Sequence, residues 1–109
     1  MTTNRVFKAL ADPTRRRVLE LLRGGAMTAG ELSDRFPVSK PTMSAHFSVL
    51  REAGLVEAEK NGRIIVYRLR MSVLEDALLE FANAFGIEAT AKAGARSRRR
   101  RTELLSEEA

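Results

Sequence analysis

The chain has 109 residues, no cysteine, a formal net charge of +5 and a sequence pI of about 10.4. This length suffices for about one domain, and a composition of 44% hydrophobic and 30% charged residues is typical of a folded domain rather than of a disordered chain. The lack of cysteine excludes disulfides, thiolate metal sites and cysteine nucleophiles, while the basic excess favours a polyanionic partner such as nucleic acid, although basic faces are often simply solvated.

Two helices are predicted at the start of the chain. The first covers about residues 4–11 and the second about residues 13–23, because Asp12 is a favourable N-cap and Pro13 a favourable first residue. A Gly-Gly pair then ends the second helix. The apolar stripe of the first helix consists of Val6, Phe7 and Leu10.

Three consecutive arginines, residues 15–17, lie near the start of the second predicted helix. The N-terminal end of a helix carries a partial positive charge, so these cations oppose the helix dipole. We therefore expect acidic side chains or phosphates to hold some of them, and for Arg15 an internal ion pair is the favoured interpretation.

A helix-turn-helix is predicted for the next segment. Thr28 and Glu31 have the spacing of a capping box, which opens a short helix that ends at Pro37. Ser39 can cap the following helix, which a glycine ends after Leu50. Two short helices with a tight connection form a helix-turn-helix. The buried stripe of the second of them consists of Met43, Phe47 and Leu50.

The opposite face of this helix is small and polar, as the major groove of DNA requires of a helix that enters it. Thr42 and Ser44 can offer hydroxyls to bases or phosphates, Ala45 can touch a thymine methyl group, and Lys40 can reach guanine or a phosphate. Arg51 can contact a phosphate or remain solvated or ion-paired. The candidate DNA-binding residues of this segment are Ser39, Lys40, Thr42, Ser44, Ala45, His46, Ser48 and Arg51.

His46 is the single histidine of the chain and lies beside the apolar stripe. A packed or phosphate-bonding side chain is the favoured interpretation, because one histidine without neighbouring ligands or a nucleophile forms neither a metal site nor a catalytic triad. No convergent acid, base and nucleophile and no cofactor loop are recognisable. We therefore expect no enzymatic activity, no catalytic residue, no cofactor and no metal.

After Leu55 the hydrophobic period changes from helical to alternating. Residues 55–59 and 64–69 are predicted to be two strands joined across Asn61-Gly62, a dipeptide typical of tight hairpin turns. This hairpin would be a two-stranded wing. Lys60 and Arg63 flank its turn, where they can reach the phosphate backbone or serve only solubility.

The last predicted helix opens at Ser72-Val-Leu-Glu75, which has the spacing of another capping box, and ends at Gly86. Its apolar stripe can complete the core of its own chain or pair with a second copy, and we expect both. The predicted dimer contacts are Val6, Phe7, Leu10, Leu74, Leu78, Phe81 and Phe85.

Residues 1–86 are thus predicted to form one winged helix-turn-helix domain for DNA binding and dimerisation, mainly α-helical with about five helices and a small β-hairpin. Residues 87–109 lose apolar periodicity and carry an arginine run followed by acids, so we expect a flexible basic tail. No apolar run approaches the roughly 18 residues of a membrane span, and the first residues lack a signal-peptide pattern. We expect no membrane insertion and a cytoplasmic location.

Four segments together resemble the ArsR-type winged-helix transcriptional repressors: ADPTRRRVLELL, MTAGELSDRF, VSKPTMSAHFSVLREAGLV and NGRIIVYRL. The resemblance covers residues 5–85 and is strongest to the short SdpR-like autorepressor branch, in which FKALADPTRR and GGAMTAGEL have close counterparts. It implies a dimer built by the first and last helices, an operator with two-fold symmetry, and repression relieved by an inducer or protein partner.

The resemblance also bears on metals. Classical members of the family bind metal through Cys-x-Cys on the third helix, where this chain has Ser33 and Arg35. The other familiar site uses paired histidines and acids on the last helix, which here has Glu75, Asp76 and Glu80 but no histidine. Transition-metal sensing is therefore not expected.

The leading hypothesis is a homodimeric repressor that binds a two-fold symmetric DNA operator sequence-specifically through the major groove, its own promoter being one possible target. The alternative is a winged-helix module that docks a protein partner without sequence-specific DNA binding, since a fold does not determine function.

Overall fold

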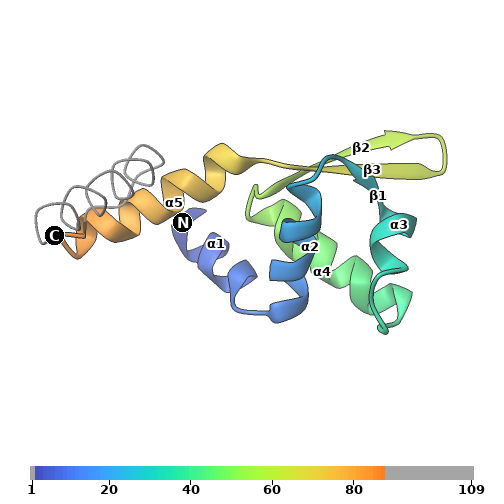
Figure 1. The fold of residues 1–109 in the computed structure, drawn as a ribbon, viewed down its shortest axis with the longest axis horizontal. Helices are drawn as coiled ribbons and strands as arrows, with labels where there is room; N and C mark the ends of the chain where they lie inside the picture. The colour runs from blue at the N-terminus through green and yellow to red at the C-terminus, as the bar shows by residue number, and fades with distance from the viewer. Residues whose placement is uncertain (1, 88–109) are drawn as a thin grey trace, which may run out of the picture. The chain divides into compact units, whose positions relative to one another are not determined.

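The structure is a computed structural model, which describes residues 2–87. All but the first residue of the predicted basic tail therefore lies outside the described residues. Figure 1 shows the elements, which in chain order are α1 (Thr2–Leu10), α2 (Pro13–Leu22), β1 (Met27–Thr28), α3 (Ala29–Ser33), α4 (Lys40–Glu52), β2 (Val56–Asn61), β3 (Ile64–Leu69) and α5 (Met71–Ala84). The predicted fold class, a mainly helical winged helix-turn-helix, is confirmed.

The chain divides into two compact units, residues 1–74 and 75–109, and the division falls within α5. The first unit contains α1 to α4, the sheet and the first residues of α5. The predicted domain boundary between residues 86 and 87 stays a prediction. Within residues 2–87, no helix has the length and apolar character of a membrane span.

The core of the first unit lies where α4 packs against α1, α2 and β2. The rings of Phe47 on α4 and Tyr67 on β3 join helix and sheet, with centroids 4.7 Å apart. The predicted stripe of α4 is buried, and Leu50 has no exposed surface. The other large buried side chains of this unit are Val6, Val18, Leu19, Leu22, Leu32, Met43, Leu55 and Val56.

Three of the four predicted helix caps are present, including that of Ser39 before α4. The Asp12 carboxylate accepts hydrogen bonds from the backbone N–H groups of Thr14 and Arg15, at 2.8 and 3.2 Å. Thr28 and Glu31 form the reciprocal capping box of α3, at 3.0 and 2.9 Å. The capping box predicted at Ser72 is wrong, because α5 begins one residue earlier and Ser72 lies within its first turn.

The sheet has three strands rather than the two predicted. All neighbours are antiparallel in the order β1-β3-β2, and Met27 of β1 pairs with Tyr67 of β3. A strand of two residues is too short for an alternating hydrophobic pattern, so β1 arises from pairing alone. Helix α3 is also shorter than predicted and ends at Ser33, before Pro37.

The predicted turn of the wing is displaced by one residue. Asn61 is the last residue of β2 and pairs with Ile64, so Gly62 and Arg63 form the two-residue loop. Gly62 has a φ of 63°, whereas no non-glycine residue in the described part has a positive φ. Glycine with a positive φ at the first loop position is typical of a type II′ turn.

Candidate nucleic-acid interface

Helix α4 presents an exposed face of small side chains. Its buried stripe faces the core, which leaves the opposite side of the helix accessible. The side chains on that side are short and polar or methyl-sized, as a helix that enters the major groove requires. The exposed members of the predicted DNA-binding set on α4 are Lys40, Thr42, Ser44, Ala45, Ser48 and Arg51.

The start of α4 is held by its N-cap residue. The Ser39 hydroxyl accepts a hydrogen bond from the backbone N–H of Thr42, at 3.3 Å, and donates one to the Thr42 hydroxyl, at 2.9 Å. The predicted capping role of Ser39 is thus confirmed. Thr42 shares its hydroxyl with the cap, whereas Ser44 takes no part in it and leaves its hydroxyl available to a base edge.

His46 is half-buried and faces α2 rather than open solvent. Its Nδ1 atom lies 3.2 Å from Nη1 of Arg15, a residue 31 positions earlier in the chain. The packed alternative for His46 therefore agrees with the structure, whereas direct contact with a phosphate stays a prediction.

The arginines at the start of α2 are held differently from what the sequence suggested. Arg15 donates to the backbone carbonyls of Ala9 and Lys8, at 2.7 and 3.0 Å, and Arg16 donates to the carbonyl of Leu10, at 2.7 Å. The predicted internal ion pair of Arg15 is wrong, because its donors are used by carbonyls at the C-terminal end of α1. Cations are favourable at that end of a helix, which offsets their unfavourable position at the start of α2.

Asp12 lies close to the same group of side chains. Desolvation raises the pKa of its carboxyl, but the backbone hydrogen bonds from Arg15 and Thr14, together with the charges of His46 and Arg15, lower it, so that the pKa lies below its usual value. Asp12 therefore carries a negative charge at neutral pH.

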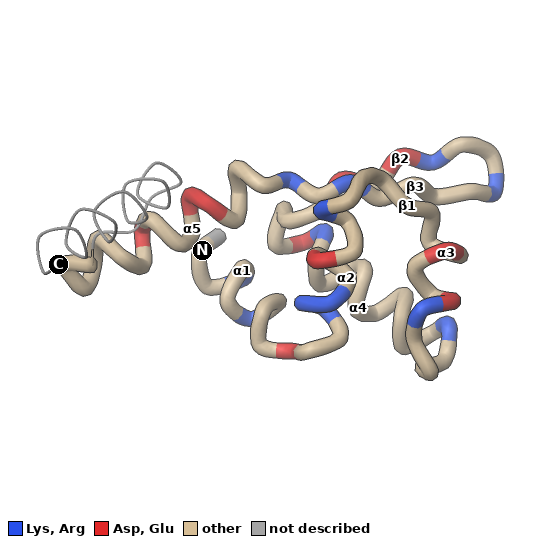
Figure 2. Tube along the Cα trace, viewed as in Figure 1, with Lys and Arg blue, Asp and Glu red and all other residues tan. Residues whose placement is uncertain are grey.

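The wing carries its cations at the turn. Lys60 and Arg63 are exposed, as predicted, and neither forms an ion pair within the described residues. Ile64 follows Arg63 directly and is 55% exposed. Figure 2 shows these basic positions at the far end of the β2–β3 hairpin, with further basic residues near the start of α4.

The base of the wing has a different character. Glu59 and Glu57 on β2 form ion pairs with Arg68 and Arg70, at 3.6 and 3.7 Å. These carboxylates neutralise the two arginines, although exposed pairs of this kind contribute little to stability. The wing can therefore attract phosphate mainly through its turn.

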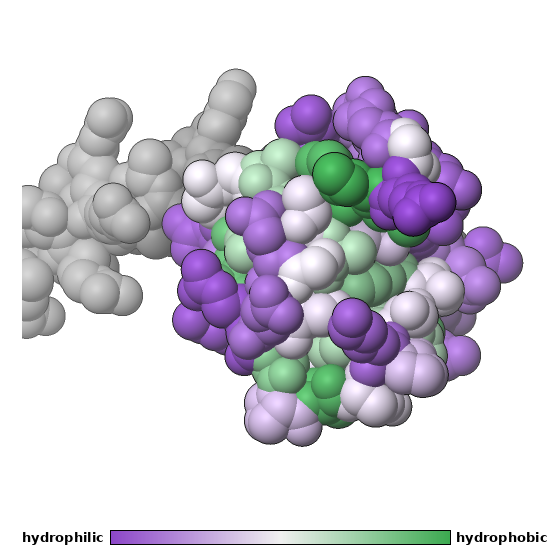
Figure 3. Space-filling view, turned by 90° about the vertical axis from the view of Figure 1, so that its right-hand side faces the viewer, coloured by the Kyte–Doolittle hydropathy of each residue, from purple (hydrophilic) through white to green (hydrophobic). Residues whose placement is uncertain are grey.

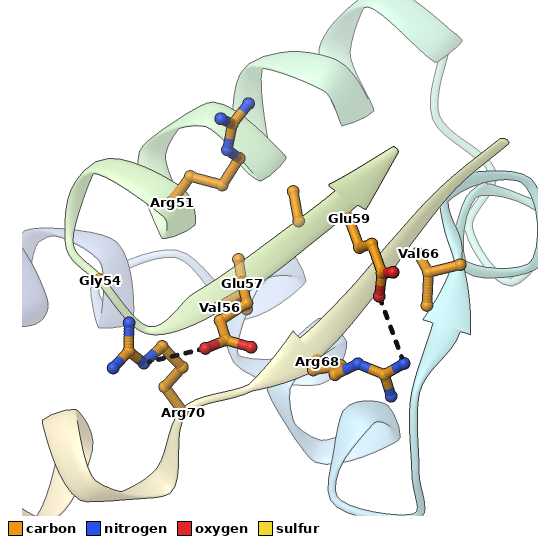
Figure 4. Close-up of a pocket in the computed structure, with 9 residues that line it drawn as sticks. Arg51, Gly54, Val56, Glu57, Glu59, Val66, Arg68 and Arg70 are labelled. Atoms are coloured by element: carbon orange, nitrogen blue, oxygen red, sulfur yellow. Dashed lines mark ion pairs between the residues drawn. The ribbon is translucent and has the colours of Figure 1, made fainter. Parts of the chain in front are cut away.

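A groove of about 530 Å³ lies along these ion pairs, and Arg51 lines it together with residues of the wing. Figure 4 shows the Arg51 guanidinium pointing away from both ion pairs. Arg51 is thus left without an acidic partner within the described part of the chain, which favours the solvated or phosphate-bound alternatives.

The start of α4 and the turn of the wing lie toward the same end of the first unit (Figure 1). Viewed from that end, the surface is mainly hydrophilic with smaller apolar areas between (Figure 3). The fold therefore places the N-terminal part of α4 and the turn of the wing toward one end of the unit, whereas Arg51 lies in the last turn of α4.

The predicted dimer residues differ in exposure. Val6 is fully buried, so it packs within its own chain and cannot present a contact surface, which corrects its assignment to the dimer interface. Phe7, Leu10 and Leu74 are half-buried. On α5, Leu78, Phe81 and Phe85 are 44%, 45% and 69% exposed.

The contact between Arg15 and His46 and the acidic partners of the wing arginines were not predicted. The sequence did contain a signal for the position of Arg15: the Asp12-Pro13 break places arginines directly after the end of a helix, next to its last carbonyl groups. Within residues 2–87, no cluster of three or more potential metal ligands is present.

Comparison with known proteins agrees with this geometry. A family described as "Helix-turn-helix domain" matches residues 10–59. The chain is 45% identical over 83 residues to the transcriptional repressor SdpR of Bacillus subtilis, an alignment that covers 73% of this chain and 92% of that protein.

Solved structures give the same result. The ArsR-like transcriptional regulator from Rhodococcus sp. RHA1 has a TM-score of 0.66 and 30% identity, over 96% of this chain and 91% of that one. The solution structure of Mb0332 from Mycobacterium bovis, described as a homodimeric winged helix-turn-helix DNA-binding domain, has a TM-score of 0.62 and 31% identity, over 76% and 78% of the two chains.

Proposed function

The chain belongs to the ArsR family of helix-turn-helix transcriptional regulators, and from that premise we propose that it is a homodimeric repressor which binds a two-fold symmetric operator. DNA binding through the helix-turn-helix and regulation of transcription, without enzymatic activity, follow from membership of the family. The reading residues, the dimer and the operator symmetry are the proposed part.

The observation that carries the proposal is the exposed face of α4. Thr42, Ser44 and Ala45 are exposed on the first turns of a capped helix, at the end of the unit that also bears the wing turn. In helix-turn-helix proteins the N-terminal residues of the second helix contact base edges in the major groove. Sequence preference is therefore assigned to α4.

The wing and Arg51 have a different role in this proposal. Lys60 and Arg63 contact phosphates beside the groove, which increases affinity for any DNA without selecting a sequence. Arg51 adds a phosphate contact further along α4, since it has no acidic partner within the described residues.

The dimer is proposed from the apolar surface of α5. Leu78, Phe81 and Phe85 recur at helical spacing and remain substantially exposed in one chain. A second copy would cover them in a symmetric interface. The relative from Mycobacterium bovis is described as homodimeric, which supports this arrangement. Two copies would read half-sites about one helical turn of DNA, or a multiple of it, apart.

Repression is proposed rather than activation because SdpR, the relative of Bacillus subtilis, is named a transcriptional repressor. Autorepression is one form of it, in which the operator lies in the promoter of the protein's own gene. A footprint on that promoter tests this form directly.

The test of the reading residues uses a DNA duplex that the protein itself selects from a random pool. Ser44→Ala should reduce affinity for this duplex by about 1–3 kcal/mol and leave affinity for random DNA nearly unchanged, if its hydroxyl bonds to a base edge. Thr42→Ala should behave alike, with a further loss from the weakened cap.

Arg63→Ala should weaken binding to both DNAs equally and lower the salt dependence by one phosphate contact. Arg17→Ala is the matched control, because Arg17 is an exposed arginine outside the proposed interface, next to Glu20 at 4.0 Å. Failure to enrich any sequence from the pool would favour the protein-docking module. Wing variants that alter sequence preference, with α4 variants that do not, would mean that the reading element is assigned wrongly.

A further inference from the structure

The side chain of Arg15 joins three helices. It belongs to α2, its Nε and Nη2 atoms donate to the carbonyls of Ala9 and Lys8 on α1, and its Nη1 atom lies 3.2 Å from Nδ1 of His46 on α4. One guanidinium group therefore links the C-terminal end of α1 to the helix that carries the exposed small residues.

Arginine suits this position for a physical reason. The last carbonyl groups of α1 lack partners within the helix and carry its partial negative charge. The planar guanidinium group spreads five N–H donors over three nitrogens in a fixed fork, so it can reach two carbonyls and a third acceptor in different directions, whereas the three donors of lysine share one nitrogen. Arg16 completes the same end of α1 through the Leu10 carbonyl, but within residues 2–87 it forms no hydrogen bond with α4.

The contact constrains the protonation of His46. A guanidinium group has donors and no acceptor, so Nδ1 of His46 must be the acceptor and cannot carry a proton. The neutral form with the proton on Nε2 satisfies this condition. Protonation of the ring would remove the acceptor and place a second cation about 3 Å from the guanidinium.

Two charged groups face His46 from the elements packed against it. They are Arg15 of α2 and Asp12 at the N-cap of that helix, whose carboxyl has a lowered pKa. Asp12 stays ionised throughout the range in which a histidine titrates, so its charge is constant there. Any protonation of the His46 ring would therefore act on its contact with Arg15 while the charge of Asp12 stays the same.

A displacement of His46 would be transmitted to the reading residues. Thr42 lies four residues before His46, one helical turn away, and Ala45 is its immediate neighbour. The rest of the α4 contact surface is apolar packing by Met43, Phe47 and Leu50, which is not directional in the way a hydrogen bond is.

We propose that Arg15 is a positioning residue for DNA reading: it holds α4 in its binding orientation against α1, and it does so only while His46 is neutral. This inference rests on the proposed function, because it takes α4 to be the reading helix. It assigns His46 to the interior contact, and acidification weakens operator binding as a consequence.

The sign of the pH effect tests the inference. Between pH 7.5 and pH 5.5 the affinity of the unaltered protein for its selected duplex, relative to random DNA, should fall by about tenfold, as expected for a lost hydrogen bond to a charged group. A histidine that contacts a phosphate directly would gain a positive charge and bind more tightly at pH 5.5. An increase in affinity on acidification therefore overturns the proposal.

Variants separate positioning from simple stability. Arg15→Ala should lose about tenfold in the same ratio at pH 7.5 and show little further change at pH 5.5. Arg16→Ala, the matched control, removes a cation from the same end of α1 and should keep the pH dependence of the unaltered protein. His46→Asn should bind the selected duplex as tightly at pH 5.5 as at pH 7.5, because the asparagine amide oxygen accepts a hydrogen bond near the position of Nδ1 at either pH.

A measurement without DNA completes the test. The chain has one histidine, so the ring nitrogen resonances of His46 are unambiguous in NMR spectra. At pH 7.5 the Nε2-protonated form should predominate in the unaltered protein and in Arg16→Ala, and should lose this predominance in Arg15→Ala. A predominantly Nδ1-protonated ring in the unaltered protein overturns the inference.

The outcomes also distinguish the two proposals. If the unaltered protein selects no sequence at pH 7.5, the proposed function fails, while the NMR measurement still judges the link between Arg15 and His46. If sequence selection succeeds and Arg15→Ala equals Arg16→Ala at both pH values, the inference alone fails. Should Arg15→Ala not fold, His46→Leu removes the same hydrogen bond from the α4 side and should give the same loss.

Discussion

Replacement of Phe81 by alanine tests the proposed dimer most directly. Phe81 is 45% exposed in one chain and lies in the middle of the apolar stripe of α5, with its ring centroid 4.9 Å from that of Phe85. If a second copy covers this stripe, Phe81→Ala should weaken dimerisation while each chain stays folded.

The magnitude follows from the exposed area. A phenylalanine side chain offers about 200 Å², so the exposed fraction corresponds to about 90 Å² by the same value. At ~25 cal/mol per Å², burial of this area contributes about 2 kcal/mol in each chain. A symmetric interface contains the residue twice, which makes about 4 kcal/mol for the dimer. The dimer dissociation constant should therefore rise by up to about a thousandfold.

Sedimentation equilibrium over a range of protein concentrations measures this constant, and circular dichroism checks that the variant is folded. Ile64→Ala is the matched control, because Ile64 is 55% exposed but lies on the wing, and it should leave the dimer constant unchanged. A folded Phe81→Ala protein with the dimer constant of the unaltered chain would refute the assignment of α5 to the interface.

Three further outcomes are expected. Asp12→Ala should lower the free energy of unfolding by about 1 kcal/mol at pH 7 through loss of the N-cap. Because the folded pKa of Asp12 lies below its usual value, this contribution is present above about pH 4 and is lost as the pH falls through the folded pKa. Urea titrations of both proteins at several pH values measure this difference. Truncation after Gly86 should lower affinity for all DNA and reduce its salt dependence, since the predicted tail carries an arginine run; an unchanged salt slope would rule out a DNA contact by the tail. Zinc and arsenite should leave operator affinity unchanged in fluorescence anisotropy, because the chain has no cysteine and one histidine, and release of the operator by a stoichiometric metal would contradict this.

The sequence predicted those features that depend on residues close together in the chain. The Asp12 cap and the Thr28–Glu31 capping box involve groups two or three residues apart, so their spacing alone makes the hydrogen bonds available. The buried stripe of α4 follows from helical periodicity in the same way, and the exposure of Thr42 and Ser44 on the opposite face follows from the stripe.

The sequence pattern alone did not fix the position of the wing turn, because two placements of the loop differ by only one residue. The dipeptide Asn61-Gly62 indicates a tight turn, but the strand register decides which two residues form the loop. Asn61 pairs with Ile64, so the loop consists of Gly62 and Arg63. A shift of this register by one residue would exchange the buried and exposed faces of β3, and Tyr67 on its buried face would lose its contact with Phe47.

The tertiary structure alone decided which distant groups meet. The sequence marks Val6 as apolar and Arg15 as a cation, but it does not show that Val6 is fully buried within its own chain. Nor does it show that Arg15 bonds to α1 and to His46, 31 residues away, rather than to an acid. Such contacts depend on how the helices pack around a common core, and packing is set by the combined shape of many side chains rather than by the spacing of a few.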